Sequence, residues 1–196
     1  MNQTKDLKII AEVLDGNTNA FSKIVDAYKD LVFTMALRLM KDRHLAEEVA
    51  QDTFIKIFKS LNKFKGKSKF SSWIYRITYN TCMDELRKKK LKFNEIPIDG
   101  SNEDKIGITN EVIVAMENNE LQAGIKKCLD LLPGETSFLL TLFYYDDLSL
   151  KEISEIVKQK PNTVKVKIHR GRQKLTGILK QHLEPEIISS YERRTT

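Results

Sequence analysis

The 196-residue sequence lacks the features of a membrane or secreted protein. No run approaches the ~18 consecutive apolar residues that suggest a membrane span, and the first residues, MNQTKDLKIIAEVLDG, contain no signal-peptide core. Cysteine is scarce, and Cys82 and Cys128 lie far apart, each within a helical pattern. We expect both to be buried, reduced thiols rather than a disulfide. We therefore expect a cytoplasmic protein without direct membrane insertion.

Patterns for catalysis and metal binding are also missing. The three histidines, His44, His169 and His182, are far apart in sequence. There is no paired-cysteine metal spacing, no glycine loop for phosphate and no nucleophile motif. We therefore expect no enzyme activity, metal, cofactor or small-molecule substrate. The alternative is an enzyme whose scattered residues converge in space.

Charge is positive and unevenly spread along the chain. The formal net charge is +6, with 41% hydrophobic and 31% charged residues, a composition that fits a soluble folded protein. Residues 1–96 carry a net charge of +7, residues 97–120 carry −5, and the remainder carries +4. An excess of cations makes nucleic acid the first candidate partner.

Two helical regions flank the acidic stretch. Residues 17–40 begin with a capping candidate, Asn17, and repeat apolar residues at helical spacing. Residues 44–61 place the following apolar side chains on or near one face: Leu45, Val49, Phe54, Ile57, Phe58 and Leu61. No run alternates like a strand, and PIDGSNEDKIGITNE has the turn formers of a linker. The sequence predicts an all-α protein of two small helical domains joined by this linker.

Residues 63–90, KFKGKSKFSSWIYRITYNTCMDELRKKK, combine aromatic and basic side chains. Helical spacing places one apolar stripe inward, so Trp73 is predicted to belong to the core rather than to stack on a base; the stripe is Phe70, Trp73, Ile74 and Ile77. A second stripe is polar and basic: Ser72, Arg76, Asn80 and Arg87. The preceding loop holds Lys63, Lys65, Gly66, Lys67, Ser68 and Lys69. Cations that neutralise phosphates, a glycine that lets the backbone approach and small polar side chains suit a single nucleic-acid strand.

Residues 148–175, LSLKEISEIVKQKPNTVKVKIHRGRQKL, have the layout of a helix-turn-helix. We expect Ser149 to cap the first helix, residues 158–161 to form the turn, and the second helix to open near Asn162 or Thr163. The expected inward residues are Ile153, Ile156, Val157, Val164, Ile168 and Leu175. The remaining surface of the second helix carries Lys165, Val166, Lys167, His169, Arg170 and Arg172. Such a helix suits the major groove of duplex DNA, whereas the alternative is an ordinary helical hairpin with a solvated basic face.

Taken together, AEEVAQDTFIKIFKSLNKFKGKSKFSSWIYRITYNTCMDELRKK and LPGETSFLLTLFYYDDLSLKEISEIVKQKPNTVKVKIHRGRQKL resemble a bacterial RNA polymerase sigma factor of the extracytoplasmic-function (ECF) type, within the sigma-seventy family. The resemblance implies a region 2 helical bundle at 1–95, an acidic linker at 96–118 and a region 4 helix-turn-helix at 119–180. The tail, 181–196, has no assigned role. A protein of this type binds core RNA polymerase, directs it to specific promoters and helps to melt the minus-ten element. Its implied partners are core polymerase, promoter DNA as duplex and melted strand, and an anti-sigma factor.

The resemblance also implies the contact residues. Core polymerase would contact Glu48, Gln51, Asp52 and Ile55, although a merely solvated helix face is the alternative for these positions. The minus-ten element would contact the loop and polar stripe of residues 63–87 described above, where Asn80 matches a position that helps to open the duplex. The minus-thirty-five element would contact the helix that starts at Thr163, through Lys165, Val166, Lys167, His169 and Arg170.

Two residues depart from the family pattern. Asn162 stands where glycine is common, and asparagine can serve equally well as a helix cap. Val166 stands where serine is common, which removes a hydrogen-bonding group and favours contact with a thymine methyl group. The departures affect promoter preference and leave the predicted fold unchanged.

The main rival is a helix-turn-helix transcription regulator that acts without core polymerase, with its first domain serving dimerisation or sensing. It accounts for the second domain equally well. It does not account for the lysine-glycine loop before WIYRITYN or for the acidic helix that precedes it. Binding to core polymerase separates the two hypotheses.

Overall fold

The computed structural model describes residues 3–92 and 119–182, and the chain divides into two compact units. Unit 1 takes in the residues up to Ile96, and unit 2 takes in most of the residues after it. Every regular element of the described residues is helical, which confirms the all-α prediction. The predicted linker and the tail beyond residue 182 lie outside these residues, and Gln181 and His182 end a helix rather than begin a tail.

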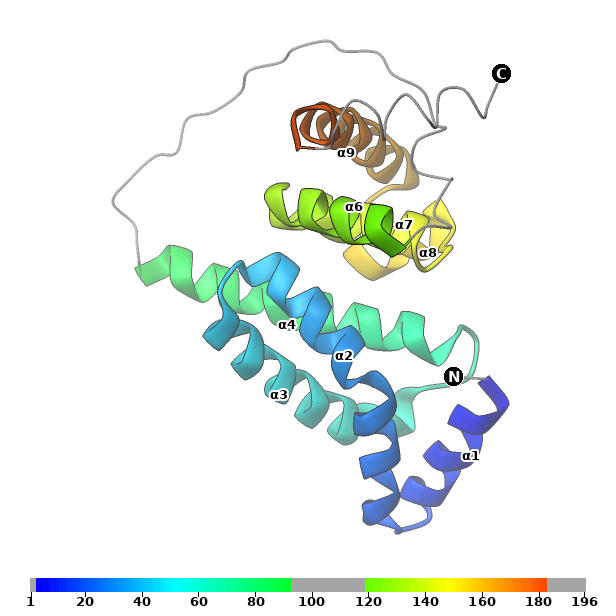
Figure 1. Ribbon diagram of the computed structural model, residues 1–196. Coiled ribbons are helices and arrows are strands. Elements are labelled where there is room, and N and C mark those ends of the chain that lie inside the picture. Colours follow the sequence, from blue (N-terminus) through cyan, green and yellow to red (C-terminus); the bar gives the residue numbers. More distant parts are fainter. Residues whose placement is uncertain (1–2, 93–118, 183–196) are drawn as a thin grey trace. The chain divides into compact units, whose positions relative to one another are not determined.

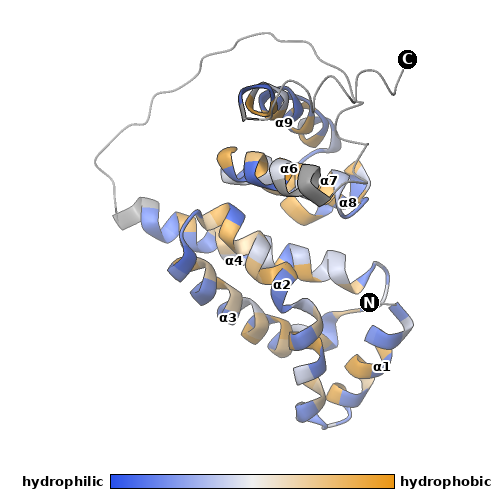
Figure 2. Ribbon diagram, in the orientation of Figure 1, coloured by the Kyte–Doolittle hydropathy of each residue, from blue (hydrophilic) through white to orange (hydrophobic). Residues whose placement is uncertain are grey.

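Unit 1 is a bundle of four helices (Figure 1): α1 (Gln3–Leu14), α2 (Phe21–Met40), α3 (Arg43–Ser60) and α4 (Phe70–Lys92). The helices α2, α3 and α4 contact one another, and α1 packs on α2. Two short 3-10 turns, η1 (Thr18–Ala20) and η2 (Leu61–Lys63), join them. Hydrophilic and hydrophobic residues are interspersed along α1, α2 and α3 (Figure 2), as expected for amphipathic helices that bury one face.

An aromatic cluster ties the start of α4 to the rest of unit 1. Phe70 is 1% exposed and Trp73 is 7% exposed, and their rings stack with centroids 5.6 Å apart. Phe64 lies edge-on to Phe70 at 5.0 Å, and Tyr28 of α2 lies edge-on to it at 5.5 Å. Aromatic pairs at these distances add ~0.5–1.5 kcal/mol each to the gain from burial. The prediction that Trp73 belongs to the core is confirmed.

Two details of unit 1 differ from the sequence prediction. Asn17 precedes η1 rather than α2, and its side chain makes no capping hydrogen bond. The helix cap that does form is Asp42, whose side chain accepts a 3.1 Å hydrogen bond from the backbone N–H of Leu45 at the start of α3. Phe58 was predicted to lie on or near the apolar face, but it is 42% exposed. Its ring contacts Phe21, with the centroids 5.0 Å apart.

Unit 2 contains α6 (Asn119–Leu131), α7 (Gly134–Tyr144), α8 (Leu150–Val157) and α9 (Pro161–His182). The predicted cap forms as a reciprocal capping box: the Ser149 hydroxyl accepts from the Glu152 N–H at 3.3 Å, and the Glu152 carboxylate accepts from the Ser149 N–H at 2.9 Å. The turn passes through Lys158 at φ 55°. Proline then occupies the first position of α9, where its missing N–H costs nothing.

The inward residues predicted for the helix-turn-helix are confirmed. All are buried: Ile153, Ile156, Val157, Val164, Ile168 and Leu175. Gly171 of α9 faces α7 so closely that a β-carbon there would lie 2.6 Å from the Thr136 methyl group. A side chain of any size would therefore push the two helices apart.

Both cysteines are free and buried, as predicted. Burial raises the pKa of the Cys82 thiol to about 12, although Lys56 acts in the opposite direction. Burial also raises the pKa of Cys128. Neither thiol is therefore in the reactive thiolate form at neutral pH.

Candidate polymerase-binding and nucleic-acid-binding surfaces

An exposed stripe runs along α3. Glu48, Gln51, Asp52 and Ile55 are all exposed, and Ile55 is 51% exposed. Their spacing of three and four residues puts them on one helix face. Phe58 extends the stripe by a further turn, so an acidic patch runs into an apolar end. We call these five residues the α3 stripe.

The loop between η2 and α4 presents lysines to solvent. Lys63, Lys65, Lys67 and Lys69 are exposed, and so is Ser68. No ion pair engages these four lysines within the described residues. Gly66 has φ +69°, a conformation that other residues rarely adopt. Residues 63–69, the basic loop, thus combine high positive charge with a backbone turn that needs glycine.

The polar stripe of α4 is partly neutralised by its own helix. Arg87 pairs with Asp84 and makes a second, weaker bond to a backbone carbonyl, and Lys88 pairs with Glu85 at 3.1 Å. Lys56 of α3 lies 3.7 Å from the same Asp84. Asp84 and Glu85 thus neutralise part of the positive charge that the sequence predicted for this surface.

The other members of that stripe lie nearer the start of α4. Arg76 is exposed, and the Asn80 amide donates a 2.6 Å hydrogen bond to the Arg76 carbonyl. Ser72, in the first turn of α4, was predicted to contact the strand, but it is only 6% exposed and its hydroxyl oxygen is buried. It packs inside the bundle and is not available on the surface. On this part of α4 the surface therefore carries Arg76 and the partly exposed Asn80, without Ser72.

The exposed face of α9 carries most of the residues predicted to contact duplex DNA: Thr163, Lys165, Val166, His169 and Arg170. Val166 is 49% exposed, an apolar side chain on an otherwise polar surface. A His169 ring nitrogen lies 3.3 Å from the Arg172 guanidinium. The structure therefore presents these side chains together on one helix.

Lys167 differs from its neighbours on α9. Its ammonium donates to a Glu135 carboxylate oxygen of α7 at 2.8 Å, and the same oxygen accepts from Gln159 of the turn at 2.9 Å. One carboxylate thus links α7, the turn and α9. Lys167 is engaged inside unit 2 in a way the sequence did not suggest.

A buried polar pair in unit 1 was also missed. The Tyr28 hydroxyl donates a 2.8 Å hydrogen bond to Asp6 of α1, and both residues are buried. Burial raises the pKa of Asp6, although the bond from Tyr28 lowers it, and burial together with that bond raises the pKa of Tyr28 above its usual range. The spacing of Asp6 with Ile9, Ile10 and Val13 was a visible signal, since all four share one buried helix face.

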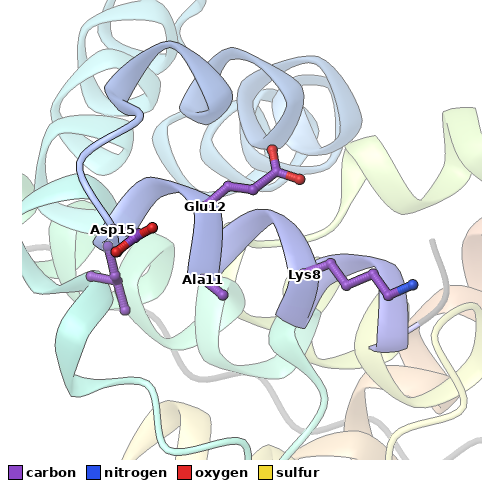
Figure 3. A pocket seen from close by; sticks show the side chains of 5 residues that line it. Lys8, Ala11, Glu12 and Asp15 are labelled. Atoms are coloured by element: carbon purple, nitrogen blue, oxygen red, sulfur yellow. The ribbon is translucent and has the colours of Figure 1, made fainter.

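A hollow of about 810 Å³ lies along α1 (Figure 3). It is lined by Lys8, Ala11, Glu12 and Leu14 of this helix and by Asp15, the residue that follows it. Glu12 is already engaged by Lys23 at 3.0 Å. The side chains labelled in Figure 3 point in different directions, so they form no convergent site.

Within the described residues, no group of histidine, cysteine and acidic side chains could hold a metal ion. None of the helices in this part of the chain is long and apolar enough to cross a membrane. The candidate surfaces of this part of the chain are therefore the exposed faces of α3, α4 and α9 and the basic loop.

A helical bundle with a basic loop, followed by a helix-turn-helix with a basic exposed face, is the architecture expected of a two-unit DNA-binding protein. The family models agree: Sigma-70 region 2 matches residues 24–92, and Sigma-70, region 4 matches residues 123–175. The chain is 35% identical over 184 residues to the ECF RNA polymerase sigma factor SigW of Bacillus subtilis (strain 168), a match that covers 86% of this chain and 93% of the relative. It is 31% identical over 164 residues to ECF sigma factor SigE of Mycolicibacterium smegmatis (strain ATCC 700084 / mc(2)155), covering 83% of this chain and 63% of that relative.

The chain belongs to the ECF sigma factors of the sigma-70 family, which bind core RNA polymerase and direct it to promoters. Solved structures share its fold. One is the sigma factor RpoE in complex with the anti-sigma factor NepR from Bartonella quintana, with TM-score 0.60, 20% identity and coverage of 82% of this chain and 96% of that one. Another is CnrH in complex with the cytosolic domain of CnrY, with TM-score 0.57, 21% identity and coverage of 88% and 96%.

Proposed function

We propose that separate surfaces perform separate steps of promoter recognition. The α3 stripe binds core polymerase, the basic loop with the polar stripe of α4 holds the melted minus-ten strand, and the exposed face of α9 reads the minus-thirty-five duplex. The separation of an acidic stripe on α3 from the cationic loop that follows it supports this division, because acids repel the phosphates that the lysines attract. The chain contributes binding, and the polymerase performs the chemistry.

The α3 stripe has the composition of a docking site. Glu48 and Asp52 can pair with cations across an interface, while Ile55 and Phe58 supply apolar area at one end. Within unit 1, Ile55 and Phe58 stay 51% and 42% exposed, although the Phe58 ring contacts Phe21. A partner that covers the whole stripe would use both kinds of contact.

The basic loop is the first proposed contact with the melted strand. Its four lysines make no ion pairs within the described residues, so phosphates can neutralise them without displacing an acid. On α4, phosphate must instead compete with Asp84 for Arg87. We therefore assign the larger part of strand affinity to the loop and the local fit of the strand to Arg76 and Asn80.

The duplex contact rests on the first turns of α9. Lys165 and Arg170 supply cations, and Val166 offers an apolar contact that suits a thymine methyl group. Lys167 has a different role in this proposal, because its bond to Glu135 holds α9 against α7. It positions the recognition helix and contributes less to DNA affinity than its charge suggests.

An anti-sigma factor is the expected regulatory partner. The sigma factor RpoE of Bartonella quintana was solved in complex with the anti-sigma factor NepR, and CnrH was solved with the cytosolic domain of CnrY. We propose that such a partner covers the α3 stripe and so competes with core polymerase. The site of action is the cytoplasm, where the polymerase is.

The test is co-migration of the purified full chain with bacterial core RNA polymerase on a native sizing column. A stable stoichiometric complex is the expected result. A chain that binds duplex DNA tightly by itself and does not associate with core polymerase would overturn this function in favour of the stand-alone regulator.

A further inference from the structure

A single carboxylate of unit 2 contacts both the turn and the candidate DNA-binding helix. Glu135 lies in the first turn of α7, where the partial positive charge of a helix N-terminus favours an ionised acid. Its oxygen Oε1 accepts two hydrogen bonds, one from the Lys167 ammonium at 2.8 Å and one from the Gln159 amide at 2.9 Å. The bond to Lys167 is therefore a salt bridge between α7 and α9.

The turn keeps this carboxylate in its place. Gln159 is partly buried, and its own amide oxygen is buried without a hydrogen-bond partner within the described residues. The donor side of the amide is thus the side that faces Glu135. Because this bond does not depend on Lys167, the negative charge of Glu135 stays beside α9 even when the lysine side chain moves away.

The lysines of α9 are not equally available to DNA. Lys165 is exposed, and no ion pair engages it within the part of the chain that the structure describes. The Lys167 side chain is 38% exposed, and its charge is compensated by Glu135. A lysine adds affinity for DNA by neutralising a phosphate, which releases a counterion. Lys167 is already neutralised, and a phosphate that approached it would also be repelled by Glu135.

We propose that Glu135 limits the sequence-independent affinity of this chain for duplex DNA by withholding Lys167 from the phosphate backbone. The inference rests on the proposed function, because α9 must lie on the duplex for the charge of Lys167 to matter. Phosphate contacts supply affinity without reading the sequence. With one such contact withheld, the side chains of α9 that face the bases supply a larger share of the affinity. Glu135 is thus a specificity-determining residue that acts through Lys167.

The test measures how the affinity of the full chain for a short duplex of arbitrary sequence changes with salt. Fluorescence anisotropy gives the slope of log affinity against log salt concentration, which steepens by ~0.9 for each phosphate that is neutralised. In Glu135→Gln the amide oxygen can still accept hydrogen bonds from Lys167 and Gln159, but the negative charge is removed. The slope should therefore steepen by about 0.9, so that the loss of affinity between about 50 and 200 mM salt grows ~3.5-fold.

Two comparisons show whether the effect passes through Lys167. Glu155→Gln makes the same change at an exposed position of α8 and should leave the slope nearly unchanged. Glu135→Gln combined with Lys167→Met should give the same slope as Lys167→Met alone, because no ammonium is released. A steepening that persists without Lys167 would overturn the proposal, since it would show a general effect of negative charge.

A second measurement decides the question even if Glu135→Gln does not fold. Lys165→Met should make the slope shallower by about 0.9, because it removes an available cation. Lys167→Met should change the slope by less than half as much. Equal changes in the two variants would overturn the proposal.

The proposal and the function on which it rests can fail separately. An unchanged slope in a folded Glu135→Gln variant, together with a shallower slope in Lys165→Met, would overturn the withholding of Lys167 alone. Unchanged slopes in both Lys165→Met and Arg170→Met would overturn the proposed contact of α9 with duplex DNA as well.

Discussion

The two units hold the cations of their candidate DNA-binding surfaces in different ways. In unit 1, Arg87 and Lys88 pair with acids three residues away on the same helix. In unit 2, Lys167 donates a hydrogen bond to Glu135, which lies 32 residues away on another helix. Glu135 also accepts a hydrogen bond from Gln159 of the turn. The pairs of α4 are local and exposed, whereas the pair of Lys167 is part of the tertiary structure.

The two kinds of ion pair suit different roles, one in binding nucleic acid and the other in holding the fold. Exposed pairs within one helix contribute only ~0.3–0.5 kcal/mol, so phosphate can replace the acids of α4 at little cost to the fold. The Glu135 contact orients α9 and is costlier to exchange. Unit 1 thus has a surface that can rearrange on a flexible strand, and unit 2 has a rigid helix that suits a regular groove.

The largest expected effect comes from reversing the charge of the α3 stripe. This change should weaken the binding of unit 1 to core polymerase and leave the binding of unit 2 to duplex DNA unchanged. Glu48→Lys with Asp52→Lys should weaken binding to core polymerase about 100-fold, since two unfavourable charge contacts cost ~3 kcal/mol. Titration of labelled chain with core polymerase measures the change. Asp15→Lys with Asp30→Lys alters the net charge equally at exposed sites elsewhere in unit 1. Equal weakening by both pairs would show that net charge, and not the stripe, controls binding.

A pair of glycines in α9 tests the rigidity assigned to unit 2. Gly171→Ala should destabilise the chain by ~1–3 kcal/mol, because the new methyl group meets Thr136 and Leu140 of α7. Gly177 has nothing within 4 Å of a β-carbon at its position, so Gly177→Ala should stabilise the helix by up to ~1 kcal/mol. Thermal unfolding of both variants measures the contrast. Equal stability changes would contradict the close packing of α7 and α9.

Removing one cation from each kind of ion pair should give a smaller difference in stability. Lys167→Met should lower the free energy of unfolding by ~1 kcal/mol, a value discounted because the pair is partly exposed. Arg87→Met should change it by less than ~0.5 kcal/mol. The order should invert for nucleic acid, with Arg87→Met weakening single-strand binding more than Lys167→Met weakens duplex binding. Chemical unfolding measures the stability of the two variants, and fluorescence anisotropy measures their affinity for nucleic acid. A Lys167→Met variant as stable as the unmodified chain would contradict the proposed role of Lys167 in holding α9.

The smallest effect is a dependence on pH in unit 1. Burial raises the pKa of Asp6 above 3.8 in the folded state, so folding favours the protonated carboxyl. Its stabilising contribution is present below that pH and is lost as the pH rises through the higher folded pKa. Asp6→Asn does not titrate, so it should gain stability relative to the unmodified chain as the pH rises from about 4 toward neutrality. Unfolding free energies at several pH values, with exposed Asp15→Asn as control, measure the trend. A difference that stays constant with pH would contradict the burial of this carboxylate.

The sequence predicted unit 2 more fully than unit 1. A helix-turn-helix is formed by one continuous stretch of the chain. The spacing of apolar residues was therefore enough to predict which of its residues are buried and which face of α9 is exposed. The Asp6–Tyr28 pair of unit 1 joins two helices, and a buried aspartate contradicts the hydrophobic pattern by which buried positions are recognised. The partner of Lys167 was equally hidden, because nothing local in the sequence connects it to Glu135. Phe58 fits the apolar pattern of α3, but the packing leaves it at the edge of the bundle.

The most direct test of the central claim is transcription by the reconstituted complex. Core polymerase with and without the chain is incubated with genomic DNA of the source bacterium, and the 5′ ends of the transcripts are mapped. Specific initiation at a set of sites that share a minus-ten and a minus-thirty-five element is predicted, and it should disappear with Glu48→Lys and Asp52→Lys. A set of transcripts identical to that of core polymerase alone would contradict the account.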